Sequence, residues 1–216
     1  MVLIYCSIKG FGVKTTMAIF SLIVARAGSQ GFKNKNIRMI GEKAVFEYSI
    51  EYSMKLNNII NDEVFTIVSS DSKVIQKYCK KNSIHFIKRK SELAKSDTRI
   101  EDVIYDAYQE IGKHFDYISL LAGNIITRYT DEFLKAYSFL EENIDYDCLF
   151  SMENVERYNP QQMFELNEDV LPKKKMTGYM RQDLKQLMYP DGHTMLFRSG
   201  HFLKFMKNNS CCSGSR

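Results

Sequence analysis

The residues best suited to chemistry lie in one short segment, RAGSQGFKNKN, at positions 26–36. Arginine, lysine, serine and asparagine side chains are gathered here, and such donors are the kind that bind a polyphosphate. Gly28 and Gly31 allow backbone conformations that a Cβ would hinder, so the main chain can approach a ligand closely. The spacing predicts a phosphate-binding loop, although a solvated basic turn after a core strand fits the same residues.

The longer stretch ARAGSQGFKNKNI resembles the first motif of the acylneuraminate cytidylyltransferases, which make CMP-activated sialic acids and related bacterial sugars. In that motif A-R-x-G-S-K-G leads to K-N. The resemblance implies that Arg26 and Lys35 act on the CTP triphosphate as the catalytic pair, and that Ser29 and Asn36 bind the nucleotide. Gln30 stands where the family usually has lysine, so one positive charge near the phosphates is missing.

A second segment, VSSDSKVIQKYCKKNSIHFIKRKSELAKSDT at 68–98, is similar to three features of the same family. These are an S-T/S-D stretch, an R-P-x-x-L-A stretch and an S/T-D-T turn. The resemblance implies nucleotide contacts from Ser70, Arg89, Asp97 and Thr98. Capping of the next helix explains Ser70 equally well, and Arg89 also fits a surface arginine. The usual proline is replaced by a lysine at position 90, and Lys95 is an insertion relative to the motif.

A third segment, ISLLAGNIITRYTDEF at 118–133, occupies the place where sialic acid synthetases read L-L-Q-P-T-S-P-L-R. Ala122 replaces the glutamine that contacts the sugar in that family, and Asn124 follows it. The resemblance therefore implies a sugar pocket suited to a different acyl sugar, lined by Asn124. It also makes Arg128 available to bind a sugar carboxylate with two parallel hydrogen bonds.

A fourth segment, YMRQDLKQLMYPDGHTMLF at 179–197, resembles the R-Q-D/Q-L-P stretch of the family, with its turn and strand. Arg181 and Gln182 are implied to face the sugar, and Asp191-Gly192 is expected to form a turn. The family continues into a D-I-D segment that binds magnesium, and this sequence has no match to it. Mg²⁺ is therefore implied by the family and the chemistry, while its ligands are unknown.

Strands and helices must alternate along the chain to position these segments. Apolar β-branched runs predict strands at 20–25, 64–69, 84–88, 116–121, 147–152 and 194–198. Helical spacing and length predict helices at 44–56, 73–82, 100–113, 130–142 and 200–207. This order predicts an α/β three-layer sandwich with a mostly parallel central sheet, of the nucleotide-diphospho-sugar transferase type. Ligands bind at the carboxyl ends of such strands, which is where the motif residues fall.

The expected organisation is one cytidylyltransferase-like domain at 17–207. Residues 1–16 are expected to be a disordered or loosely attached extension, and residues 208–216 a tail. An excursion at about 153–192 has lost the periodicity of the rest. In the resembled family a comparable region packs against a second subunit, so a homodimer is expected.

Composition limits the function classes. With 216 residues and 44% hydrophobic content the chain can form a full core, and a net charge of +4 does not indicate nucleic-acid binding. No run is long and apolar enough for a membrane helix, and we expect a cytoplasmic protein. The five cysteines contain no C-x-x-C pair, which argues against a disulfide scaffold or a zinc site. Cys79 and Cys148 are expected to be buried small hydrophobes.

The resemblance implies a nucleotidyltransferase that joins CMP from CTP to an acidic 2-keto-3-deoxy sugar of the sialic, legionaminic or pseudaminic acid type, with release of pyrophosphate. Two alternatives stay open. One is a catalytically impaired paralogue that binds nucleotide or dimerises without turnover, suggested by Gln30, the altered Gly123-Asn124 loop and the missing aspartates. The other is a nucleotidyltransferase for another sugar or nucleotide, because the fold serves many.

Overall fold

The structure is a computed structural model that describes residues 2–7, 17–28, 31–155, 158–160, 163 and 185–210. For residues 2–7 and residue 210 it describes the backbone alone. The strands are β1 (Val2–Ser7), β2 (Ala18–Val24), β3 (Met39–Ile40), β4 (Lys43–Ala44), β5 (Glu63–Ser70), β6 (His85–Lys88), β7 (Tyr117–Ala122), β8 (Tyr146–Asn154) and β9 (Met188–Arg198). The helices are α1 (Val45–Ile59), α2 (Lys73–Lys81), α3 (Ile100–Ile111), α4 (Thr130–Glu142) and α5 (Ser199–Ser210), with short 3-10 helices η1 (Lys35–Ile37) and η2 (Ser91–Leu93).

The main sheet has the strand order β1-β8-β9-β7-β2-β5-β6. The central strand β2 pairs in parallel with β5 and with β7, and β5 pairs in parallel with β6. Strand β9 is antiparallel to both β7 and β8, so β8 runs in the same direction as β7 although the two are not neighbours. The result confirms the predicted α/β class with a mostly parallel sheet.

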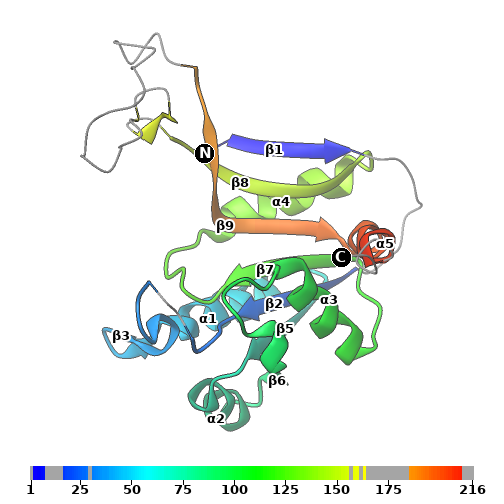
Figure 1. Ribbon diagram of the computed structural model, residues 1–216. Helices are drawn as coiled ribbons and strands as arrows, with labels where there is room; N and C mark the ends of the chain where they lie inside the picture. The colour runs from blue at the N-terminus through cyan, green and yellow to red at the C-terminus, as the bar shows by residue number, and fades with distance from the viewer. Residues whose placement is uncertain are drawn as a thin grey trace.

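Helices cover both faces of this sheet (Figure 1). On one face α1, α2 and α4 pack over a core that includes Ile23, Phe46 and Leu140. On the other face α3 and α5 pack over a core that includes Phe20, Ile104 and Phe202. Because β2 is covered on both sides, its residues 19–23 are all buried, as the continuous apolar run predicted.

The local signals at helix ends agree with the structure. Ser72 caps α2 by accepting a hydrogen bond from the Ile75 N–H at 3.5 Å. Gly112 ends α3 with φ +63°, a conformation that glycine adopts without strain. The start of α2 and the end of α3 are therefore well defined.

Three regions differ from expectation. Strand β9 begins at Met188, well before the predicted start at 194, and Asp191 and Gly192 lie within it. The predicted turn is instead an irregularity in the β8–β9 register, where Gly192 has φ +75° and the Asp191 carboxylate accepts the His193 N–H at 2.8 Å.

The two ends of the chain also depart from the sequence pattern. Val2–Ser7, expected to belong to an extension, pairs antiparallel with β8 as the edge strand β1. Helix α5 continues to Ser210, beyond Lys207 where its pattern ended. Most of the expected excursion, residues 164–184, lies outside the described residues.

Candidate active site

The loops at the carboxyl ends of β2, β6 and β7 meet around a cavity of about 180 Å³. Six of the residues predicted from the sequence line it, namely Arg26, Lys35, Asn36, Arg89, Thr98 and Asn124. They come from three segments that are far apart in the chain. The cavity lies where ligands bind in open parallel sheets, because the strands end there and the loops are free to vary.

Hydrogen bonds to neighbouring strands hold the first loop in place. The Asn36 Nδ2 donates to the Arg26 carbonyl oxygen at 2.8 Å, which ties η1 back to the end of β2. The Ala27 N–H donates to the Asp71 Oδ1 at 2.7 Å, which ties the loop to the end of β5. The Arg26 guanidinium reaches across to the Ala94 carbonyl oxygen at 3.4 Å. The loop is therefore anchored at both ends while its cations face the cavity.

Asn36 has one polar atom without a partner. The side chain is 4% exposed, and its Oδ1 is buried with no hydrogen-bond partner, although Nδ2 is bonded. A buried acceptor left unpaired costs about 1 to 3 kcal/mol, so such an atom usually has a partner. Since Asn36 lines the cavity, a donor on a bound ligand would supply that partner.

Arg89 is buried, at 7% exposed, between the cavity and β5. Its Nε donates to the Ser69 hydroxyl oxygen at 3.3 Å, and a terminal nitrogen donates to the Ser69 carbonyl oxygen at 2.9 Å. Burial lowers the Arg89 pKa to about 10, with nearby Asp71 opposing the shift and Arg26 adding to it. Arg89 therefore remains a cation at neutral pH, but one that is poorly solvated and gains from a bound anion.

Arg89 also lines a neighbouring cavity of about 720 Å³ that contains three lysines. All three are exposed, and Lys90 pairs with Asp106. Lys95 lines both cavities. Sequence reasoning treated Lys95 as an insertion and missed it. Its charge beside the matched Leu-Ala and Asp-Thr residues was the available signal.

Thr98 lies in the cavity wall, where its hydroxyl donates to the Glu92 carbonyl oxygen at 3.2 Å. Gly123 brings the opposite wall close to β2. A Cβ at Gly123 would lie 2.7 Å from the Ala25 Cβ and 3.0 Å from the Val24 carbonyl oxygen. Only glycine fits this contact, and the next residue, Asn124, is thereby placed at the edge of the cavity.

Three other predicted site residues do not line this cavity. Ser70 is fully buried, and its hydroxyl donates to the Ala25 carbonyl oxygen at 2.5 Å. Asp97 is exposed, and Arg128 donates to oxygens of the surrounding protein. The remaining predicted residues, Ser29, Arg181 and Gln182, lie outside the described residues, as does Gln30.

Residues 20–208 match a protein family described as "Cytidylyltransferase". The chain belongs to this family. Its cavity of cations at the carboxyl edge of a parallel sheet is thus the candidate active site of a cytidylyltransferase.

Two kinds of curated protein are similar to this chain in sequence. An N-acylneuraminate cytidylyltransferase of Streptococcus agalactiae is 25% identical over 190 residues, covering 85% of this chain and 44% of the relative. A CMP-N,N'-diacetyllegionaminic acid synthase of Campylobacter jejuni is 35% identical over 100 residues, covering 45% of this chain and 40% of the relative. The chain spans less than half of the length of these relatives.

Solved structures share the fold. A CMP:2-keto-3-deoxy-manno-octonic acid synthetase complexed with CTP has a TM-score of 0.64 at 11% identity, covering 89% of this chain and 78% of that one. A 4-diphosphocytidyl-2C-methyl-D-erythritol synthase from Anaerococcus prevotii has a TM-score of 0.51 at 13% identity, covering 88% and 77%. Among the residues that the structure describes, no helix is long and apolar enough to span a membrane.

The acidic residues that the structure describes do not form a ready metal site. The part of the chain that the structure describes contains no group of three His, Cys, Asp or Glu side chains placed to hold an ion. Asp71 is the carboxylate beside Arg89, and one of its oxygens is bonded to the first loop. The described residues thus do not form a complete ligand set for Mg²⁺.

The two discussed cysteines differ. Cys79 is fully buried on the inner face of α2, which confirms that it packs as a small hydrophobe, and burial raises its pKa to about 11. The same prediction was wrong for Cys148, which is only half-buried on β8. Neither lines the cation-rich cavity.

Proposed function

We propose that this cytidylyltransferase binds CTP in the 180 Å³ cavity and its surroundings and transfers CMP to an acidic 2-keto-3-deoxy sugar. The observation that carries the proposal is the unpaired Asn36 Oδ1, set among the cations of Arg26, Lys35, Arg89 and Lys95. A nucleotide offers both kinds of partner, since its base amino group and ribose hydroxyls are donors and its phosphates are anions. An inorganic anion alone would leave the Asn36 acceptor unpaired.

In the proposed reaction a sugar hydroxyl oxygen forms a bond to the α-phosphorus of CTP. The bond from that phosphorus to the bridging oxygen breaks, pyrophosphate leaves, and the hydroxyl proton is released. The described residues that line the cavity include no acid and no histidine, so they contribute by position and charge. Arg26 and Lys35 would neutralise charge on the triphosphate as pyrophosphate leaves.

The sugar class rests on the relatives. One of them is named for N-acylneuraminate and another for N,N'-diacetyllegionaminic acid, and both names denote acidic sugars. Asn124 at the cavity edge is the described candidate for a sugar contact, with Arg181 and Gln182 kept as proposals outside the described residues. A homodimer is part of the same proposal, and light scattering of the purified chain tests it.

Magnesium remains a proposal without a complete ligand set. Mg²⁺ in nucleotide sites is often held by one or two carboxylates, waters and the substrate phosphates, so Asp71 could serve in part. When bound, the ion would offset charge on the departing pyrophosphate. The test is whether added Mg²⁺ tightens CTP binding and whether Asp71→Asn removes that gain.

A calorimetric titration with CTP, UTP, ATP and GTP tests the nucleotide proposal. We expect selective binding of CTP, and an Asn36→Leu substitution that weakens it by about tenfold or more, as expected when a buried hydrogen bond to the ligand is lost. Asn143→Leu is the matched control, because the Asn143 Nδ2 also donates to a backbone carbonyl, at 2.8 Å from Phe139 O. Equal binding by the wild type and Asn36→Leu would contradict the proposed site.

Pyrophosphate release separates a working enzyme from the impaired alternative. We expect release with CTP plus an acidic nine-carbon 2-keto sugar, and a Gln30→Lys variant that changes the rate little. CTP binding without release for any tested sugar, with turnover restored by Gln30→Lys, would support the impaired paralogue instead.

A further inference from the structure

Arg128 is held by four oxygen acceptors from three parts of the fold. Its terminal nitrogens donate to the Ala122 carbonyl at 2.8 Å, the Ile125 carbonyl at 2.9 Å and the Ser49 hydroxyl at 2.9 Å. Its Nε donates to the His193 carbonyl at 3.2 Å. All three guanidinium nitrogens are therefore engaged. A two-point contact to a carboxylate needs two nitrogens facing outward, and this arrangement does not offer them.

The acceptors are themselves well fixed. Ser49 is fully buried in α1 and also donates to the Ala122 carbonyl at 3.1 Å. The Tyr52 ring lies 5.7 Å from the guanidinium carbon. Burial lowers the Arg128 pKa to about 10, so the group stays charged at neutral pH while it is shielded from solvent. Charged donors in such surroundings make stronger hydrogen bonds than neutral donors.

Two of the residues that accept hydrogen bonds from Arg128 flank Asn124, and one of them, Ala122, lines the cavity together with Asn124. Ala122 and Ile125 lie on either side of Gly123 and Asn124, and the Gly123 N–H donates to the Val24 carbonyl at 2.9 Å. Asn124 is thus carried on a short turn held from both sides. Its position at the cavity depends on Ala122, which also lines the cavity, and on Ile125, which does not.

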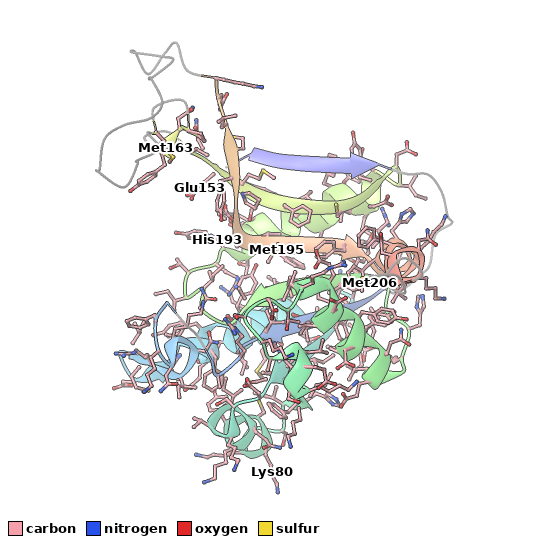
Figure 2. The ribbon with its side chains drawn as sticks, in the orientation of Figure 1. Lys80, Glu153, Met163, His193, Met195 and Met206 are labelled. Atoms are coloured by element: carbon pink, nitrogen blue, oxygen red, sulfur yellow. The ribbon has the colours of Figure 1, made fainter. Side chains whose placement is uncertain are left out.

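The fourth acceptor joins this turn to β9. His193 follows the irregular residues Asp191 and Gly192, and it lies beside the chain that leaves β7 (Figure 2). A Cβ at Gly192 would be 3.2 Å from the Ile125 side chain, so the two segments pack closely. Irregularities of this kind re-aim a strand near functional sites. Arg128 therefore links the β7 turn to the β9 irregularity.

We propose that Arg128 is a positioning residue that fixes Asn124 at the cavity and joins the β7 turn to β9, and that it does not bind the sugar carboxylate. The positioning itself is independent of the substrate. Only the kinetic part of the test rests on the proposed function.

Hydrogen exchange of Arg128→Lys tests the positioning without any ligand. Lysine keeps a charge but cannot make four bonds in this fork geometry. We expect amide exchange in 122–128 and 191–194 to become at least tenfold faster. The matched control is Arg198→Lys, because Arg198 also donates to backbone carbonyls, at 2.9 Å to Tyr146 O, but lies at the opposite end of β7. Unchanged exchange in 122–128 would overturn the proposal.

A double-mutant cycle with Asn124→Ala tests whether Arg128 acts through Asn124. If it does, each single variant lowers kcat/KM by about tenfold, and the double variant has the same kcat/KM as the less active single variant. Multiplying effects would show that the two residues act separately, and would overturn the proposal. Ser49→Ala, which keeps the arginine and removes one acceptor, gives a milder version should Arg128→Lys not fold.

An acidic sugar and its carboxamide analogue separate positioning from direct binding. We expect wild type and Arg128→Lys to prefer the acidic sugar by the same factor. The substitution should change KM by one factor and kcat by one factor, each the same for the acidic sugar and for its carboxamide. Loss of that preference in Arg128→Lys would mean that Arg128 binds the carboxylate. If wild type binds no CTP and turns over no sugar, the proposed function fails, while the exchange experiment still decides the role of Arg128.

Discussion

Each end of β7 has an arginine whose side chain donates several hydrogen bonds, but the two arginines have different roles. At the carboxyl end Arg128 holds a turn whose neighbours line a cavity. At the amino end Arg198 donates to the Tyr117 hydroxyl at 2.8 Å and to the Tyr146 and Leu140 carbonyls, and Tyr117 donates to Glu141. Burial and the Glu141 hydrogen bond raise the pKa of Tyr117 above its usual range.

The difference lies in what is left unpaired nearby. At the amino end the described partners satisfy one another. At the carboxyl end the Asn36 Oδ1 has no partner, and Arg89 is buried beside Arg26, whose charge repels it. One end is built for stability, and the other keeps unsatisfied groups that a ligand can satisfy. Substitutions at the two ends should therefore affect different measurements.

The largest effect is expected for Arg89→Met. Losing a buried charge-assisted contact to the nucleotide should weaken CTP binding by about 100-fold, which corresponds to about 2.7 kcal/mol. Stability should change less than in Arg198→Met, because methionine fills the space and the Ser69 carbonyl keeps the Ala25 N–H as a second donor. Calorimetry and thermal unfolding measure the two quantities.

Arg198→Met is the opposite case at the amino end. It leaves Tyr117 and two backbone carbonyls without their donor, so we expect a loss of about 2 to 3 kcal/mol in unfolding free energy. CTP affinity should stay within about twofold of wild type. A large affinity loss in Arg198→Met at temperatures where it is folded would remove the distinction between the two ends.

A smaller effect is expected for Gly123→Ala, where the added Cβ meets the Ala25 Cβ and the Val24 carbonyl oxygen. Forcing the β7 turn away from β2 should cost about 1 to 3 kcal/mol and weaken CTP binding through Asn124. Gly200→Ala is the control, because it lies in α5 with nothing within 4 Å of the new Cβ. That variant should be neutral or slightly more stable.

The smallest effect is expected for the pH dependence of stability that arises from the buried Cys79 thiol. Burial raises the Cys79 pKa from 9.0 to about 11, so the folded state holds this proton where the unfolded state releases it. Stability should therefore fall as pH rises from about 9 toward 11, by about 1 to 2 kcal/mol from this thiol. Denaturant unfolding of Cys79→Ala should show a flatter pH dependence in that range. An unchanged slope would mean that Cys79 is not responsible.

Local patterns identified most of the elements. The predicted helices at 73–82, 100–113 and 130–142 agree with α2, α3 and α4 to within two residues at either end. The predicted start of β9 was wrong because Pro190, Asp191 and Gly192 are typical of turns. In the structure, Pro190 and Tyr189 pair with Met152 and Glu153 of β8, and this pairing extends the strand through the turn-like residues. Tertiary pairing here outweighs a local propensity.

The sequence by itself determined the order of strands and helices, the buried central strand, and the motif residues that gather at one edge of the sheet. Only the tertiary structure decided which of those residues face the cavity. Spacing shows that Arg26, Arg89 and Arg128 are available as cations, but not whether their donors are already used. For Arg128 the answer lies in Ser49 and His193, which are 79 and 65 positions away along the chain. A donor is free for a ligand only when such distant acceptors are absent, and folding alone brings them together.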